Sequence, residues 1–119
     1  MNWTPLVWLE LLCFPVAIAA GQILFKRAAA QMTGVSGPWL WELARLPSMW
    51  LALALYAVST LLWVKILTTV PLSRAYPFVA LAFILVPAAG YLFFDEPING
   101  RLAAGTALII AGVIVAVRA

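Results

Sequence analysis

Apolar residues dominate four stretches of this chain, and short polar segments separate them. A helix needs about 20 mostly apolar residues to cross the hydrocarbon core of a bilayer. The sequence therefore predicts spanning helices at about 5–25, 48–69, 75–94 and 102–117. The run GTALIIAGVIVAV at 105–117 lacks the alternation of polar and apolar residues that marks a membrane β-strand, which favours helices over a barrel.

The composition supports the same class, because 66% of the residues are hydrophobic and 9% are charged. We expect an all-α integral membrane protein with one four-helix domain over residues 1–119. The sequence has no histidine, and Cys13, its single cysteine, falls inside the first span. It shows no metal-ligand spacing, glycine-rich phosphate loop or nucleic-acid pattern. We therefore expect no enzyme activity, no metal, no cofactor and no nucleic-acid partner.

Two segments outside this pattern have alternative interpretations. The first apolar stretch lacks the basic region of a cleaved signal peptide, and we expect it to be retained. Between the first two spans, apolar residues recur at helical spacing over about 38–46. They predict either a short helix in the headgroup plane or an ordered loop, and both place Trp39 and Trp41 at the interface.

The basic residues do not assign an orientation to the four spans. The N-terminus, the second loop and the C-terminus share one side, and the other two loops lie opposite. The first side then has three basic residues, Lys65, Arg74 and Arg118. The opposite side has four, Lys26, Arg27, Arg45 and Arg101. This near-tie fits dual topology, and it also fits an orientation fixed by a partner or by the insertion machinery.

Glu10 and Lys65 are predicted at similar depths, about 6 to 8 Å inside the same membrane boundary. Charged groups inside a bilayer usually pair or face a cavity, so these two residues predict an ion pair. Their long side chains can also reach the interface without a partner.

Arg74 follows Ser73, a candidate N-cap, at the predicted start of the third span, and Pro77 is expected in its first turn. A guanidinium beside the positive end of a helix suits a phosphate group. The alternative is an arginine that only anchors the helix to bulk lipid headgroups.

Several further residues are candidates for a substrate path or for structural roles. Gln22 and Tyr76 can line a polar seam or hydrogen-bond between helices. Pro87 and Gly90 predict a kink in the third span, either a hinge or a static bend. The adjacent carboxylates Asp95 and Glu96 predict a cap and turn, or a gate against Lys26, Arg27 or Arg101.

Gly105 and Gly112 form a stripe of small residues along the fourth span, together with Ala104 and Ala111. Such stripes allow helices to approach closely and often mark an oligomer seam. Because four helices enclose little volume, we expect a dimer.

Four segments carry a resemblance that covers most of the chain: GQILFKRAA at 21–29, LWVKILTTVPLSRAYPFVALAF at 62–83, DEP at 95–97 and GTALIIAGV at 105–113. The chain resembles the small multidrug-resistance-type branch of the drug/metabolite transporter superfamily. Within that branch it is most similar to the paired subunits of the undecaprenyl-phosphate aminoarabinose flippase.

This resemblance implies a multi-pass subunit that moves a lipid-linked sugar across the bacterial inner membrane. The subunit would dimerise with itself or with a related four-helix chain. By position, Lys65, Arg74 and Tyr76 match the block of the flippase-like members, and Gly105 and Gly112 match the dimerisation motif. Lys26 matches the lysine that ends the first helix in the family.

One departure separates the flippase branch from the cation exporters of the same family. Those exporters carry a glutamate eight residues before the lysine, where this chain has Ile18. The flippase is therefore our first hypothesis. The alternatives are an efflux pump for cationic compounds with Glu10 as an off-centre proton site, and an accessory membrane subunit of a glycolipid-modifying system.

Overall fold

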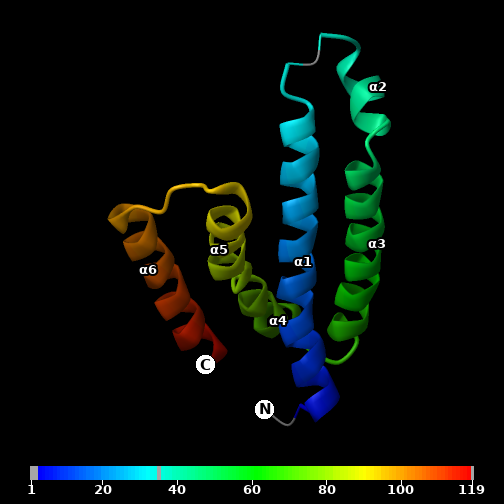
Figure 1. Cartoon of the computed structure of the whole chain (residues 1–119). Coiled ribbons are helices and arrows are strands. Elements are labelled where there is room, and N and C mark those ends of the chain that lie inside the picture. The colour runs from blue at the N-terminus through cyan, green and yellow to red at the C-terminus, as the bar shows by residue number, and fades with distance from the viewer. Residues whose placement is uncertain (1–2, 35, 119) are drawn as a thin grey trace.

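The computed structural model describes residues 3–34 and 36–118, and this part of the chain folds into six helices (Figure 1). Four helical segments are long and apolar enough to cross a membrane, which confirms the predicted all-α, four-span architecture. The third of these segments combines α4 and α5. The helices are α1 (Pro5–Gln31), α2 (Trp39–Ala44), α3 (Pro47–Leu67), α4 (Leu72–Val79), α5 (Ala82–Phe94) and α6 (Gly100–Val117).

Helix α1 is longer than its apolar pattern predicts, because it continues past Lys26 and Arg27 to Gln31. Both basic residues are good helix formers and do not end a helix by themselves. The Ser48 hydroxyl donates a hydrogen bond to the Gln31 Oε1 atom at 3.0 Å, which ties the end of α1 to the start of α3. At 1.5 Å per residue α1 is about 40 Å long, so it exceeds the hydrocarbon core.

The third span is interrupted at residues 80–81 and forms two helices, α4 and α5. At the interruption the amides of Ala80 and Leu81 each bond three residues back, to Pro77 and Phe78, at 3.1 Å. Prolines at 77 and 87 lack an amide hydrogen, so the helical ladder is weakened on both sides. The sequence predicts a kink at Pro87, but α5 continues through this residue. The interruption lies one to two turns before it.

Helix α4 begins at Leu72, and the prediction that Ser73 caps a helix beginning at Arg74 is wrong. Pro71 precedes the helix in an extended conformation, and its carbonyl accepts the amides of Arg74 and Ala75 at 3.0 and 2.9 Å. Proline fixes the backbone angle that starts the helix without needing a side-chain cap. Ser73 therefore lies within the first turn, and Pro77 lies beyond it.

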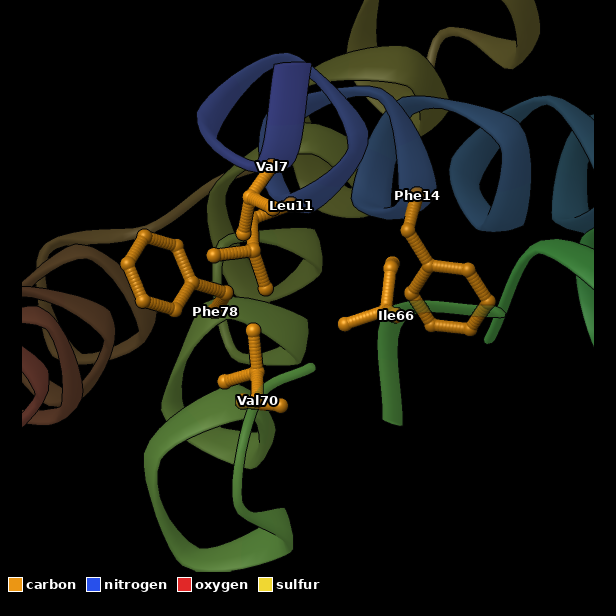
Figure 2. Close-up of a cluster of buried hydrophobic side chains, with 7 residues drawn as sticks. Val7, Leu11, Phe14, Ile66, Val70 and Phe78 are labelled. Carbon is orange, nitrogen blue, oxygen red and sulfur yellow. The ribbon is translucent and has the colours of Figure 1, made fainter. Parts of the chain in front are cut away.

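The main hydrophobic core joins α1 to the α3–α4 corner (Figure 2). Leu11 points into a space bordered by Phe78, Val70 and Ile66, with Phe14 beside Ile66. Ala75 is fully buried in the same cluster. Because Ala75 and Phe78 face the core, the intervening part of α4 turns Tyr76 away from it, toward other surfaces of the bundle.

Helices α2 and α6 lie at the edges of the molecule (Figure 1). Helix α6 packs against α4 and α5, and none of its residues is buried. Helix α2 has six residues, fewer than the predicted 38–46, and it exposes Trp39 and Trp41. Its placement in the headgroup plane stays a prediction.

Candidate functional site

The largest hollow described here is a groove of about 910 Å³ bordered by α1, α4, α5 and α6. Two predicted site residues, Gln22 from α1 and Tyr76 from α4, line it. Ser73 adds a hydroxyl, and most of the other lining residues are apolar: Ile18, Pro77, Val79, Ala80, Ala82, Phe83, Val86, Pro87, Ile109, Gly112, Val113 and Ala116. The groove therefore combines an apolar wall with a few polar groups, as small-molecule sites do.

Tyr76 contacts one of two stacked aromatic residues, Trp63 and Phe14, that were not predicted as site residues. Its ring meets Trp63 edge-on, with centroids 6.1 Å apart, and Trp63 stacks on Phe14 at 4.8 Å. Tyr76 and Trp63 also line a smaller cavity of about 280 Å³ between α1, α3 and α4. The available signal for Trp63 was its position two residues before Lys65 in the motif that carries the family resemblance.

Glu10 and Lys65 form the ion pair that the sequence predicts, with the Nζ and Oε2 atoms 3.4 Å apart. The Glu10 side chain is 11% exposed, whereas that of Lys65 is 62% exposed. Within the described part of the chain the Oε2 atom makes no hydrogen bond, so its contact with Lys65 is electrostatic. Neither residue lines the large groove.

Arg74 is half-buried in the first turn of α4, close in sequence to the end of α3 that carries Lys65. It directly follows Ser73, which lines the groove, but it is not itself a lining residue. The first amides of any helix lack intrahelical partners and form its positive end. The start of α4 therefore combines a guanidinium with a helix N-terminus, two features that favour an anion.

A second charged pair lies where the α5–α6 connection meets α1. The Lys26 Nζ atom is 3.6 Å from the Glu96 Oε2 atom. Asp95 ends α5 in the left-handed conformation, with φ of 53°, and the Glu96 amide donates to the Gly90 carbonyl at 3.2 Å. The predicted cap and turn is present and brings Glu96 to Lys26, whereas a gating role stays a prediction.

Gly105 and Gly112 face open space, since a Cβ atom added at either position meets no atom within 4 Å. Gly112 also lines the large groove. A second chain packed on this stripe would therefore cover part of the groove. Dimerisation through these glycines stays a prediction.

No family model and no solved structure matches the chain. Curated proteins do match it, and the relatives described here carry the name probable 4-amino-4-deoxy-L-arabinose-phosphoundecaprenol flippase subunit ArnE. The protein from Enterobacter sp. (strain 638) is 35% identical over 104 residues, which are 87% of this chain and 91% of that protein. The protein from Pseudomonas syringae pv. syringae (strain B728a) is 38% identical over 93 residues, 78% of this chain and 83% of that protein.

The match to the Pseudomonas aeruginosa (strain UCBPP-PA14) protein is closer in identity but shorter. It is 44% identical over 70 residues, which are 59% of this chain. The chain therefore spans 61% of the length of that relative.

Proposed function

The chain belongs to the family of ArnE flippase subunits, and we propose that it helps to move a polyprenyl-phosphate-linked amino sugar across the bacterial inner membrane. The names of its relatives describe such a lipid, an amino-deoxy-arabinose on phosphoundecaprenol. The observation that carries the proposal is the groove lined by Gln22, Tyr76 and Ser73, the last of which directly precedes Arg74 in α4.

The parts of the groove suit the three parts of such a lipid. The apolar wall formed by α5 and α6 accommodates the start of the polyprenyl tail, whose remainder stays in the bilayer. The amide of Gln22 and the hydroxyl of Tyr76 can hydrogen-bond to the hydroxyls of the sugar. Arg74 binds the phosphate through two parallel hydrogen bonds, with Lys65 adding positive charge nearby.

The efflux alternative needs Glu10 as a free, exchangeable carboxylate, but Glu10 already contacts Lys65 and lies outside the groove. An accessory subunit without transport is the remaining alternative, and the following experiment separates it from the flippase. In none of these roles is the chain itself an enzyme.

The test is lipid movement in vesicles that contain the chain with any partner subunit that copurifies. The vesicles also carry the aminoarabinose-phosphate lipid on both leaflets, and impermeant periodate oxidises sugar diols on the outer leaflet only. We expect the protected half of the lipid to become oxidised in these vesicles faster than in protein-free vesicles. Equal rates in the two preparations would contradict transport and favour the accessory role.

The transporting unit is proposed to be a dimer, either of two copies or of this chain with a related four-helix subunit. Replacing Gly105 or Gly112 with leucine is expected to weaken association about tenfold or more, a loss of about 1.4 kcal/mol of close helix packing. The open space around both glycines predicts that each chain still folds.

The matched control is Ala107→Leu, which adds similar bulk to α6 away from the two glycines: Ala107 and Ile84 line a cavity between α5 and α6 that neither glycine lines. Analytical ultracentrifugation in detergent measures association for all three variants. An equal loss of dimer in the control would show that the dimer interface is not formed specifically by Gly105 and Gly112.

A further inference from the structure

The Lys26–Glu96 pair lies at a cavity that the proposed phosphate corner does not use. This cavity has a volume of about 350 Å³ and is bordered by α1, α5 and the segment that follows α5. Lys26, Glu96 and Gln22 supply its polar side chains. Its size falls within the range of sites for small molecules, about 300–1,000 Å³.

This cavity continues the large groove toward the other membrane face. Gln22 and Val86 line both hollows, so they adjoin at these two residues. Gln22 and Lys26 are four residues apart on α1 and share one face of that helix. A head group that has reached Gln22 therefore comes to Lys26 and Glu96 by moving about one further helical turn along α1.

Glu96 is distinguished among the acidic residues of the described chain by its place at this cavity. Glu10 contacts Lys65, and Glu42 contacts Arg45 at 3.6 Å. Asp95 forms the left-handed end of α5, and none of these three residues lines the cavity or the groove. A cationic group that travels along this path therefore meets one carboxylate, that of Glu96.

The fold holds this carboxylate in place through Gly90. The Glu96 carboxylate lies where a side chain at position 90 would begin, so any Cβ atom there collides with it. The Glu96 amide is bonded to the Gly90 carbonyl at 3.2 Å, which fixes the backbone of the turn. The absence of a side chain at position 90 thus lets Glu96 lie over α5 and reach the cavity.

We propose that Lys26, Glu96 and Gln22 form a second head-group site, specific for a zwitterion that carries an ammonium and a phosphate. This inference rests on the proposed function. The ammonium of the amino sugar replaces Lys26 at the Glu96 carboxylate, and the released Lys26 ammonium binds the phosphate. Both charges are therefore paired before and after the exchange.

The exchange is feasible because the Lys26 and Glu96 side chains are 51% and 49% exposed. Ion pairs at this exposure contribute little to stability, so their separation is easily compensated by new partners. The phosphate corner and this second site act in sequence because they lie far apart. Lys65 of the corner contacts Glu10, and Glu10 and Lys26 are 16 residues apart on α1, about 24 Å. The head group thus leaves one site before it occupies the other.

The test compares two lipids in the same vesicles, the aminoarabinose-phosphate lipid and the arabinose-phosphate lipid that lacks the amine. Periodate protection reports the movement of both, because both sugars carry vicinal diols. We expect the wild-type protein to move the amino lipid about tenfold faster than the lipid that lacks the amine, and Glu96→Gln to slow the amino lipid until this preference is lost. Gly90→Ala should have the same effect, because it displaces the carboxylate and keeps its charge.

Asp95→Asn is the matched control, since it removes a neighbouring charge while asparagine tolerates the left-handed conformation at that position. It is expected to preserve the preference. Equal movement of both lipids by the wild-type protein, or equal slowing of both by Glu96→Gln, overturns the second site and leaves the proposed function standing. Movement of neither lipid overturns both proposals.

Discussion

Replacing Arg74 with alanine is expected to weaken the binding of polyprenyl phosphate about 10- to 100-fold. A hydrogen bond to a charged group contributes about 1.5–3 kcal/mol, and the loss of about one such bond corresponds to this change in affinity. The affinity of Arg74→Lys should lie between those of the wild type and Arg74→Ala. Lysine keeps the positive charge but cannot form two parallel hydrogen bonds to the phosphate. Native mass spectrometry with added polyprenyl phosphate measures the bound fraction for each variant.

The control for this prediction is Arg101→Ala, which removes an exposed arginine from the first turn of α6. Arg101 lines neither the groove nor the cavity at Glu96. An equal loss of binding in both alanine variants would show that Arg74 acts only through the general attraction of basic residues for lipid headgroups. A parallel loss of folded protein in Arg74→Ala would assign the residue a structural role instead.

Replacing Lys65 with methionine is expected to destabilise the fold by about 1–3 kcal/mol, because Glu10 would remain buried without a partner. The long methionine side chain keeps most of the packing of the lysine stem, which isolates the loss of charge. Adding Glu10→Gln to Lys65→Met should recover most of the loss, since the buried charge is then removed as well. Unfolding by sodium dodecyl sulfate in mixed micelles measures the four proteins of this cycle.

The coupling between the two substitutions is the decisive quantity. Additive effects of Glu10→Gln and Lys65→Met would show that the two residues do not interact in the membrane. In that case the side chain of Lys65 reaches the interface independently, as the alternative interpretation of the sequence has it. Strong coupling would support the Glu10–Lys65 ion pair. Lys65 would then have to leave Glu10 before it could bind a phosphate.

The hydrophobic pattern predicted the four spans because each one needs a long apolar segment, and this requirement is visible residue by residue. It did not predict the end of α1, since Lys26 and Arg27 are compatible with both a helix end and a continuing helix. The hydrogen bond from Ser48 to Gln31 comes from another helix and has no local signal. The start of α4 was misplaced because Pro71 begins the helix without the side-chain cap that Ser73 suggested.

The candidate site was predicted in part. Glu10 and Lys65 were paired from their depths alone, since burial in a bilayer leaves charged residues few alternatives. Gln22 and Tyr76 were identified as polar residues inside apolar spans, and they do line one groove. Trp63 was not identified as a site residue, because a tryptophan in a membrane helix is ordinary until its contact with Tyr76 is seen.

The sequence by itself determined the membrane class and the number of spans, because these depend on the partition of single side chains between water and hydrocarbon. Only the tertiary structure decided which residues share a cavity. Lys26 and Glu96 are 70 positions apart, and their contact depends on the left-handed turn at Asp95 and the missing side chain of Gly90. Such contacts follow from the packing of whole helices, which no local pattern of apolar and polar residues specifies.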